Sequence, residues 1–446
     1  MKTSRRNFIQ KAALGTSAAM MGGATSLSAK SYKKVIGAND RIQVAIAGLG
    51  RRVSAMYTPI ALKSNNVELL YMCDVMDSQR VKAAKEMATR LDYTPKLEND
   101  IRKVLEDKQV DAFFNLTPDH WHAPGSIMAL KEGKHVYVEK PCSHNMAENQ
   151  LLVAAQKKYD RVVQMGNQQR SAEHSIEIIK AIHNGIIGTP YKAVAFFSNK
   201  RGEVPHQKSA AIPKGLDWEL FQGPAVRRDY TSETWNYNWH WYGWNYGTAE
   251  LGNNGTHELD VARWALQVNY PNHVSVDGIK TAFVHDGWEM YDTMEATFKF
   301  DNNTTIKWDG KSRNGYSTYG GGRGTIIYGS EGSVLVNRDL YKLYDREGNL
   351  LKTVHSKYKE GGIELGGGGG MTSIHVANFF NTIRGKETLQ APIDDASFSM
   401  ALVHYGNVAY RINKSFEVDP LTGRMLDLKA LELWGREYAK GWEPSI

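Results

Sequence analysis

The stretch IQVAIAGLGRRV, residues 42–53, decides the fold of this chain. Its first six residues are apolar except for Gln43, which is typical of a strand buried on both faces of a sheet. Gly48 and Gly50 follow at once and predict a tight turn into a helix. Gly48 permits the turn, and Gly50 lets the main chain approach a pyrophosphate group at the helix N-terminus. Val53 replaces the third glycine of the full dinucleotide pattern, so the motif needs support from elsewhere in the chain.

That support comes from Asp74, which follows the next apolar run, 26 positions after Gly48. A carboxylate at the end of the second strand accepts hydrogen bonds from both ribose hydroxyls of NAD and repels the 2′-phosphate of NADP. Arg51 and Arg52, which follow the turn, carry positive charges that would favour the additional phosphate of NADP. Because strand, turn, helix and carboxylate agree, we predict an NAD-binding Rossmann unit, with NADP as the less favoured cofactor.

The pattern of apolar residues along the chain predicts the fold class. Up to Met165, short apolar runs alternate with helical stretches, as in a doubly wound parallel sheet. Later, alternation as in TMEATF at residues 293–298 is typical of an antiparallel sheet with one wet or partner-facing side. We therefore predict an α/β protein with an N-terminal Rossmann domain at residues 40–165. A C-terminal α+β domain with a large, mostly antiparallel sheet is predicted at residues 166–446. The predicted helices include residues 54–63, 78–89, 124–131, 147–158, 173–183, 375–384, 396–411 and 428–439, and the predicted strands include residues 67–73.

The first 29 residues are predicted to be an export segment. Arg5 and Arg6 precede Phe8 and an Ala- and Gly-rich apolar stretch at residues 12–24, and small residues then cluster up to Ala29. This order resembles a twin-arginine signal peptide, so we expect the protein to be periplasmic. The apolar stretch is too short for a permanent membrane anchor, and no other stretch is a candidate.

Composition argues against several other classes of function. The net charge is +7, but the export segment carries four basic residues and no acidic one, so its removal lowers the charge to +3. Basic residues elsewhere are scattered, and we expect no nucleic-acid partner. The two cysteines, Cys73 and Cys142, each lie near the end of a predicted Rossmann strand, and we expect both to be unpaired. The histidines show no metal-ligand spacing such as HExxH, so no metal site is predicted.

Two motifs follow predicted strands of the Rossmann sheet: NLTPDHWH at residues 115–122 and KHVYVEKP at residues 134–141. Because the carboxyl ends of parallel strands meet at the sheet edge that binds ligands, we expect both motifs beside the cofactor. Near a cationic nicotinamide ring, like charge and loss of solvation lower the pKa of a lysine such as Lys140, so that it can exchange protons near neutral pH. The alternative role for Lys140 is a surface salt bridge with Glu139.

These motifs resemble those of the Gfo/Idh/MocA oxidoreductases, the family of glucose–fructose oxidoreductase and inositol dehydrogenase. The resemblance covers nearly the whole chain after the export segment. It implies that Lys140 lies beside the nicotinamide ring and the reacting carbinol. The residues then expected around the cofactor are Gly48, Gly50, Arg51, Arg52, Asp74, Thr117, Pro118, His122, Glu139 and Lys140.

A further motif, GTAELGNNGTHELDVARW at residues 247–264, is similar to the substrate half of the site in this family. The resemblance implies that His257 exchanges the proton of the substrate hydroxyl, so that Lys140 and His257 form the catalytic pair. Members of the family often have an aspartate four residues before this histidine, where this chain has Asn253. An asparagine can hydrogen-bond a substrate but cannot take its proton, which narrows the proton route to Lys140 and His257.

The segment WNYNWHWYGW at residues 235–244 predicts a sugar site. Flat rings suit the apolar face of a pyranose, and the interleaved Asn and His suit its hydroxyls. The alternative is a domain core or subunit interface, and we expect part of the segment to be core while Trp239 and His240 reach the ligand. The other candidate substrate-binding groups are Asp260, three residues from His257 on one helix face, and Gln169 and Arg170 after the last Rossmann strand.

The sequence therefore predicts an NAD-dependent enzyme that exchanges a hydride between its cofactor and a sugar, glycoside or polyol carbinol. Because little free NAD is expected outside the cytoplasm, the cofactor should stay tightly bound. Two alternatives remain open: an NAD-dependent glycoside hydrolase that works by transient oxidation, elimination and re-reduction, and a non-catalytic sugar-binding module. The expected partners are a small sugar or glycoside and further copies of this chain, joined through the C-terminal sheet.

Overall fold

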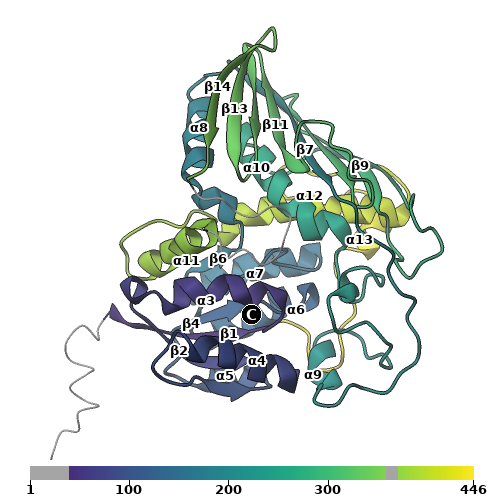
Figure 1. The fold of residues 1–446 in the computed structure, drawn as a ribbon. Coiled ribbons are helices and arrows are strands. Elements are labelled where there is room, and N and C mark those ends of the chain that lie inside the picture. The colour runs from purple at the N-terminus through teal and green to yellow at the C-terminus, as the bar shows by residue number, and fades with distance from the viewer. Residues whose placement is uncertain (1–39, 358–369) are drawn as a thin grey trace, which may run out of the picture. The chain divides into compact units, whose positions relative to one another are not determined.

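The computed structural model describes residues 40–357 and 370–446. Two sheets, one of six strands and one of nine, organise the unit that runs from Ile42 to Ile446 (Figure 1). The six-stranded sheet is parallel throughout. The nine-stranded sheet is mostly antiparallel. The predicted fold class is therefore confirmed. The predicted export segment lies outside the described residues.

The six-stranded sheet consists of β1 (Ile42–Ala47), β2 (Val67–Cys73), β3 (Lys96–Glu98), β4 (Ala112–Asn115), β5 (His135–Val138) and β6 (Val163–Met165). Their order in the sheet is β3-β2-β1-β4-β5-β6. The central strand β1 pairs with β2 and β4, and its residues from Val44 to Ala47 are fully buried, which explains its apolar sequence. The strand order reverses between β1 and β4, so a crevice for ligands is expected at their carboxyl ends.

Helices cover both faces of this sheet (Figure 1). One face is covered by α3 (Ser54–Ala61), α4 (Asp77–Ala88) and α11 (Gly370–Ile383), and the other by α5 (Ile101–Glu106), α6 (Asp119–Lys131) and α7 (Met146–Tyr159). Helix α11 comes from far along the chain, yet its Phe379 and Phe380 pack against Phe114 of β4. The rings of Phe114 and Phe379 meet edge to face with their centroids 5.7 Å apart.

The nine-stranded sheet has the order β14-β13-β12-β11-β7-β10-β9-β8-β15. Its strands are β7 (Pro190–Ser198), β8 (His273–Ile279), β9 (Thr293–Lys299), β10 (Thr305–Lys311), β11 (Arg323–Gly329), β12 (Gly332–Val336), β13 (Leu340–Asp345), β14 (Leu350–His355) and β15 (Phe416–Glu417). Only β7 and β10 run parallel among these neighbours. In β9 the side chains of Met294, Ala296 and Phe298 are buried while Glu295 and Lys299 are exposed, as the alternating pattern predicts.

Three helices pack against this second sheet: α8 (Glu173–His183), α10 (Thr256–Leu266) and α12 (Ile393–Ile412). Helix α12 contacts β8 and α10 on one side and α7 of the first sheet on the other. It therefore joins the two halves of the unit, and α10, which carries His257, is held against both α12 and the second sheet.

Helix α6 begins at Asp119, earlier than the predicted start at Pro124. A proline inside a helix cannot donate to the carbonyl four residues before it, here that of His120. The guanidinium of Arg436 donates to this carbonyl oxygen at 2.7 Å. The free acceptor is thus satisfied by a side chain from the other end of the sequence, and the motif residues from Asp119 to His122 form the first turn of α6.

The C-terminal segment also differs from the prediction, because helix α13 covers only Leu428–Glu432. The chain beyond it runs across the first turns of α6 and α7. Arg436 and Tyr438 both bind the buried carboxylate of Glu148, at 2.8 and 2.9 Å. Trp442 lies edge to face on Trp121, with 5.2 Å between the ring centroids.

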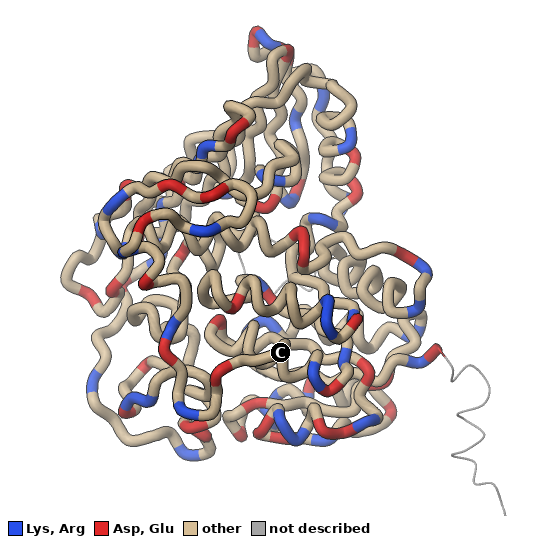
Figure 2. The backbone as a smooth tube through the Cα atoms, turned by 180° about the vertical axis from the view of Figure 1, so that it is seen from behind, with Lys and Arg blue, Asp and Glu red and all other residues tan. Residues whose placement is uncertain are grey.

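Cys73 and Cys142 are both buried and unpaired, as predicted. Acidic and basic residues are interspersed along the chain in the view of Figure 2. Among the residues described, no helix is both long enough and apolar enough to cross a membrane.

Candidate active site

The glycine turn after β1 leaves the main chain open at its tip. Gly48 has φ of +88°, and a Cβ atom there would lie 2.3 Å from the carbonyl oxygen of Leu116, so only glycine fits. At Gly50 a Cβ atom would meet nothing within 4 Å. The short turn of helix Arg51–Val53 and then α3 follow, so the tip of the turn offers space at a helix N-terminus, as the sequence predicts for a pyrophosphate site.

Asp74 is fixed beside this turn, directly after β2. One carboxylate oxygen accepts from the main-chain N–H of Leu49 at 2.7 Å, and the other accepts from that of Met76 at 2.8 Å. Burial raises the pKa of Asp74, and these two hydrogen bonds act in the opposite direction. The carboxylate is therefore oriented by the main chain and keeps further acceptor positions for hydroxyl donors.

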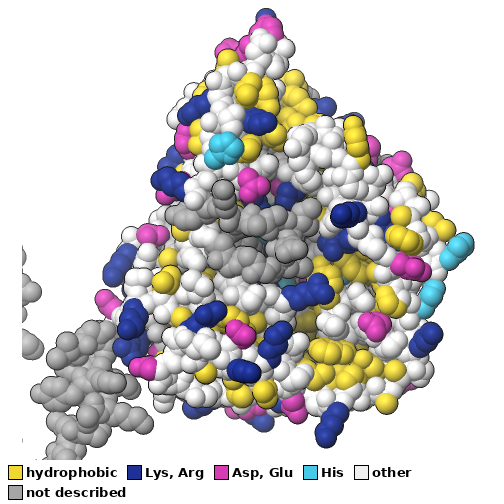
Figure 3. Space-filling model, viewed as in Figure 1, with side chains coloured by type: hydrophobic (Ala, Val, Ile, Leu, Met, Phe, Trp, Pro, Cys, Tyr) yellow, Lys and Arg dark blue, Asp and Glu magenta, His cyan; other side chains and the backbone are white. Residues whose placement is uncertain are grey.

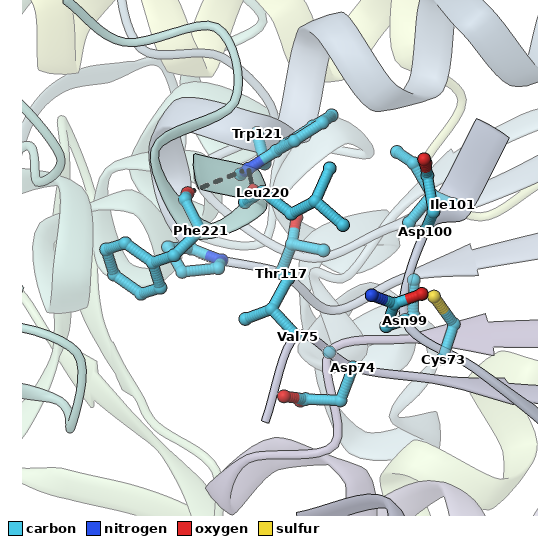
Figure 4. A pocket seen from close by; sticks show the side chains of 13 residues that line it. Cys73, Asp74, Val75, Asn99, Asp100, Ile101, Thr117, Trp121, Leu220 and Phe221 are labelled. Atoms are coloured by element: carbon cyan, nitrogen blue, oxygen red, sulfur yellow. Dashed lines mark hydrogen bonds between the residues drawn. The ribbon is translucent and has the colours of Figure 1, made fainter. Parts of the chain in front are cut away.

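A small pocket, about 440 Å³ when the solvent at its open side is included, adjoins Asp74 (Figure 4). It is lined by Ala47, Gly48, Cys73, Asp74, Val75, Asn99, Asp100, Ile101, Thr117, Pro118, Trp121, Leu220 and Phe221. The lining is largely apolar, with the Asp74 carboxylate on one side, which suits an adenosine group. The indole N–H of Trp121 donates to the carbonyl oxygen of Phe221 at 3.0 Å and so fixes the outer wall. Leu220 and Phe221 belong to helix α9 (Trp218–Gln222), which the sequence analysis missed.

The two arginines after the turn have different partners. Arg52 donates to the buried carboxylate of Glu139 at 2.6 Å, which ties the glycine turn to the end of β5. Arg51 lies over the ring of Tyr237, with 4.3 Å between its guanidinium carbon and the ring centroid. Arg52 and Glu139 were both expected at the cofactor. The structure places them beside the turn, but they neutralise each other there.

Thr117, Pro118 and His122 lie where β4 passes into α6. The hydroxyl of Thr117 donates to the side-chain oxygen of Asn115 at 2.6 Å. His122 is bonded through Nδ1 to the carbonyl oxygen of Pro141 at 2.6 Å, and burial lowers its pKa to about 4. Its Nε2 is buried without a hydrogen-bond partner among the described residues. A neutral imidazole therefore has one ring nitrogen available at the carboxyl edge of the sheet.

Lys140 reaches the second half of the site. Its ammonium group donates to the main-chain oxygen of Asn253 and lies 3.4 Å from the side-chain oxygen of the same residue. Loss of solvation lowers the pKa of Lys140 to about 8, although the charges of Asp119 and Glu139 oppose this shift. Because Glu139 is bonded to Arg52, a simple salt bridge between Glu139 and Lys140 does not describe the structure.

Asn253 lies in a turn of π-helix, Leu251–Gly255, that leads into α10. Such turns are frequent at functional sites because they displace backbone groups from the regular helix. The buried carboxylate of Glu250, just before the turn, accepts from Ser312 at 2.9 Å and from Arg201 at 3.2 Å. These bonds hold the turn so that the Asn253 carbonyl faces Lys140.

His257 follows in the first turn of α10 and is buried. Burial holds its pKa well below the ordinary value, and nearby positive charges, among them those of Arg338 and Lys140, act in the same direction. The imidazole is therefore neutral at physiological pH, and one of its ring nitrogens can accept a hydrogen bond from a hydroxyl group. The structure thus brings Lys140 and His257, which are far apart in the sequence, into one electrostatic neighbourhood.

Asp260 and Arg170, which the sequence predicts to bind substrate, are paired with each other in the structure. Their side chains form two hydrogen bonds with each other, at 2.7 and 2.8 Å, and both residues are buried. Asp260 also accepts from Ser399 of α12 at 2.7 Å. The pair therefore joins the start of α8 to α10 and α12. Gln169 is buried beside it, and its side-chain oxygen has no partner among the described residues.

The aromatic segment is divided between core and site wall. Trp241 stacks on Trp288 with 3.9 Å between ring centroids and belongs to the main core. Trp239 packs in a separate cluster with Trp218 and Phe221, next to the adenosine-type pocket. The ring of His240 lies tilted against that of Trp239, with 3.6 Å between centroids, and its Nδ1 is buried without a partner in the described part of the chain.

The charges near His240 place it in the same neighbourhood as the lysine. Its pKa is lowered well below the usual value, first by burial and then by the charges of Lys140 and Arg201. On the face shown in Figure 3, hydrophobic side chains lie in a hollow that Lys and Arg side chains border. Within the described ranges, no group of three or more His, Cys, Asp or Glu residues could hold a metal ion.

Comparisons with known proteins agree with this geometry. A model described as "Oxidoreductase family, NAD-binding Rossmann fold" matches residues 42–167. A second model, "Oxidoreductase family, C-terminal alpha/beta domain", matches residues 172–355. Both are models of the Gfo/Idh/MocA family, and together they cover more than half of the chain.

Curated relatives match over part of their length. The chain is 29% identical over 156 residues to a glycosyl hydrolase family 109 protein of Saccharopolyspora erythraea, which covers 34% of this chain and 34% of that protein. It is 28% identical over 151 residues to the inositol 2-dehydrogenase of Salmonella typhimurium, which covers 33% of this chain and 44% of that protein. The chain thus spans about a third to a half of the length of the curated relatives it matches.

Solved structures match over nearly their full length. A levoglucosan dehydrogenase in complex with NADH and levoglucosan is 18% identical, has a TM-score of 0.63, and is covered over 99% of its chain and 84% of this one. An aldose-aldose oxidoreductase from Caulobacter crescentus complexed with glycerol is 17% identical, with a TM-score of 0.61 and coverage of 100% of its chain and 85% of this one. These likenesses show the shared fold. From the two family models and this fold, we conclude that the chain belongs to the Gfo/Idh/MocA family of NAD-binding oxidoreductases.

Proposed function

We propose that this protein is an enzyme that exchanges a hydride between a retained NAD and the carbinol of a sugar, glycoside or polyol. The observation that carries the proposal is Lys140, which follows β5 at the carboxyl edge of the NAD-binding sheet with a pKa of about 8, and whose charge acts on the neutral, buried His257 of α10. An amine that titrates near neutral pH at this edge, with a second basic side chain in its electrostatic neighbourhood, suits the proton exchange that oxidation of an alcohol requires.

The residues around the glycine turn fit NAD. The open main chain at Gly50 suits the pyrophosphate, and the oriented carboxylate of Asp74 suits the adenosine ribose. Asp74 also supports NAD over NADP, because a 2′-phosphate would meet its negative charge. When bound, the nicotinamide supplies hydride transfer, and the protein supplies orientation and proton exchange.

In the oxidative direction, Lys140 and His257 take the hydroxyl proton of the substrate, and in the reductive direction they return it. Asn253 orients the amine of Lys140 through its main-chain oxygen. His240 offers an unused ring nitrogen to a substrate hydroxyl, with the face of Trp239 beside it. An aromatic wall with a few polar groups is the usual composition of a sugar site.

The names of similar proteins support this substrate class. Two of them are an inositol 2-dehydrogenase and a levoglucosan dehydrogenase, which act on a polyol and a sugar derivative by their names. A second candidate function is glycoside hydrolysis through transient oxidation, elimination and re-reduction. It is favoured by the match to glycosyl hydrolase family 109 proteins, one of which, from Shewanella baltica, aligns with 53% of this chain at 23% identity. The presence of both Lys140 and His257 argues against a non-catalytic sugar-binding module.

The decisive experiment is incubation of the purified protein with a panel of sugars, polyols and glycosides plus an electron acceptor, followed by mass spectrometry of the products. Accumulated ketosugar supports the oxidoreductase. Released sugar without ketosugar identifies the hydrolase, and binding with neither product identifies the module. The matched control is Lys140→Ala, which should retain NAD and form neither product.

Two further properties belong to this proposal. We propose that the protein is exported in its folded state with its cofactor bound. Residues 1–29 resemble a twin-arginine signal, and a route that carries folded proteins would let bound NAD travel with the protein. Changing Arg5 and Arg6 together to Lys should then retain the protein in the cytoplasm, and unchanged export would contradict this. We also propose that copies of the chain associate through the nine-stranded sheet, which sedimentation of the purified protein would test.

A further inference from the structure

We propose that Asp119 is the charge partner of Lys140: a buried carboxylate of α6 that positions the lysine and balances its charge during proton exchange. The inference deepens the proposed function and rests on it for the importance of Lys140 to the reaction. The placement of the two residues stands on the structure alone. Asp119 was not among the residues that the sequence analysis singled out for the site.

Asp119 lies in the first turn of α6 with only 2% of its surface exposed. Its carboxylate accepts from the hydroxyl of Thr248 at 2.6 Å. A Cβ atom at Gly252 would lie 1.9 Å from that hydroxyl oxygen and 3.6 Å from Cγ of Pro141, the residue after Lys140. The hydroxyl that binds Asp119 is therefore enclosed between the π-helical turn and the chain next to the lysine.

The direct contacts of Lys140 leave its charge without compensation. Its ammonium group donates to the main-chain oxygen of Asn253 and lies near the amide oxygen of the same side chain, and both oxygens are uncharged. A cation that has lost solvation is stable only beside an opposite charge. Among the described residues, the compensating carboxylate must then come from one that Lys140 does not touch directly.

Three other buried carboxylates on the lysine side of the site are already paired with arginines. Glu139 binds Arg52 at 2.6 Å, Glu250 binds Arg201 at 3.2 Å, and Glu258 binds Arg323 at 2.7 Å. Asp119 instead accepts from a neutral hydroxyl. Among these four carboxylates of the described chain, it is the one whose charge no arginine offsets.

The electrostatics of the two residues agree with the pairing. Burial raises the pKa of Asp119 to about 7, and Lys140 is the nearby charge that most opposes this shift. Loss of solvation lowers the pKa of Lys140 to about 8, and Asp119 is the charge that most opposes that shift.

Several other groups act on the lysine. Glu139 favours its charged form, while Arg323 and Arg338 disfavour it. The remaining titratable groups in its electrostatic neighbourhood are His122, His240 and His257. All three imidazoles have pKa values below the usual range, so they carry no charge near pH 7. The state of Lys140 near neutral pH is therefore governed by Asp119, Glu139 and the two arginines.

The test measures the titration of Lys140 without measuring turnover. The protein as purified is reductively methylated over a range of pH, and mass spectrometry follows the peptide that contains Lys140. Only the neutral amine reacts, so the midpoint of labelling reports its titration. We expect a midpoint near pH 8 for the natural protein and a downward shift of about one to two pH units in Asp119→Asn. Asp119→Glu keeps the negative charge, so its labelling midpoint should lie close to that of the natural protein.

Asp111→Asn is the matched control, because Asp111 is an exposed carboxylate at the opposite end of β4. An unchanged midpoint in Asp119→Asn, or an equal shift in Asp111→Asn, would overturn the proposal. If Asp119→Asn does not fold, Thr248→Val serves in its place. That variant removes the hydrogen bond that stabilises the ionised form of Asp119. It should shift the midpoint in the same direction as Asp119→Asn, but by a smaller amount. Because no substrate is used, a wrong substrate class would leave these results unchanged.

Discussion

The guanidinium of Arg51 lies over the ring of Tyr237, with its central carbon 4.3 Å from the ring centroid. Arg51 directly follows the glycine turn of the NAD-binding sheet, and Tyr237 belongs to the aromatic segment before the π-helical turn. The hydroxyl of Tyr237 also lies 3.5 Å from a guanidinium nitrogen of Arg201, which binds Glu250. One tyrosine therefore links the cofactor side of the site to its substrate side.

We predict that Tyr237→Ala loses NAD faster than the natural protein. A cation–π contact is worth about 0.5–2 kcal/mol, so its loss should raise the dissociation rate roughly 2- to 30-fold. The measurement is the absorbance and mass spectrum of supernatant from denatured protein after timed dialysis. Tyr237→Phe keeps the ring and is the control. Equal retention by all three proteins would show that the contact does not hold the cofactor.

The oxidative rate should depend on pH through Lys140. The neutral amine accepts the proton, and the pKa of Lys140 is lowered to about 8, so the rate should rise by about tenfold per pH unit below 8 and level off above it. His257 titrates well below its ordinary range and should add no limb near neutral pH. Lys140→Arg keeps a permanent charge and should be inactive throughout. A flat profile between pH 6 and 9 would contradict this role.

His257 and Asp260 lie three residues apart on α10 but should respond differently to substitution. His257→Ala should lower turnover by about two to four orders of magnitude, the usual contribution of a general acid–base group, with little change in stability. Asp260→Ala leaves the buried Arg170 with only Asp395, at 3.0 Å, as its charge partner and should lower the free energy of unfolding by about 3 kcal/mol. Denaturant unfolding and single-turnover kinetics on both variants separate the two effects. Similar losses in both measurements for both variants would refute the distinction.

Asp74 should determine the choice between NAD and NADP. Asp74→Ser removes charge-assisted hydrogen bonds to the ribose and the repulsion of a 2′-phosphate, so NAD binding should weaken by about 2–4 kcal/mol while the preference over NADP narrows. The same carboxylate holds the N–H groups of Leu49 and Met76, which adds to the loss. Calorimetric titration with both cofactors is the measurement, and Glu86→Gln on the exposed side of α4 is the control. An unaltered ratio would assign the preference to another residue.

The sequence was sufficient for the parts of the fold in which local pattern and burial coincide. β2 (Val67–Cys73) and α8 (Glu173–His183) have the predicted bounds because their apolar residues follow the period of the element. β14 (Leu350–His355) was missed because most of its residues are exposed, so no apolar alternation marks it. Pro124 was taken for the start of α6, since the side chain that satisfies His120 lies more than 300 residues away.

The site divides in the same way. The glycine turn, Asp74 and Lys140 could be found from the sequence because each follows a predicted strand that fixes its position. The partners of these residues could not, since Asp119 meets Thr248 and Arg170 meets Asp260 only after the chain has folded. Spacing on a helix placed Asp260 near His257 correctly but could not show that Arg170 already occupied its carboxylate.

Helix α11 also determines when one apolar face of the NAD-binding sheet can be fully covered during synthesis. The sheet ends at Met165, but Phe379 and Phe380, which cover Phe114 on one face, belong to residues made much later. At ribosomal rates of about 5–20 residues per second, this face of the nascent sheet stays without its α11 contacts for roughly 10–40 s. The growing chain therefore exposes an apolar, aggregation-prone surface throughout the translation of its second half. Chaperone binding to stalled nascent chains should end once α11 has emerged from the ribosome.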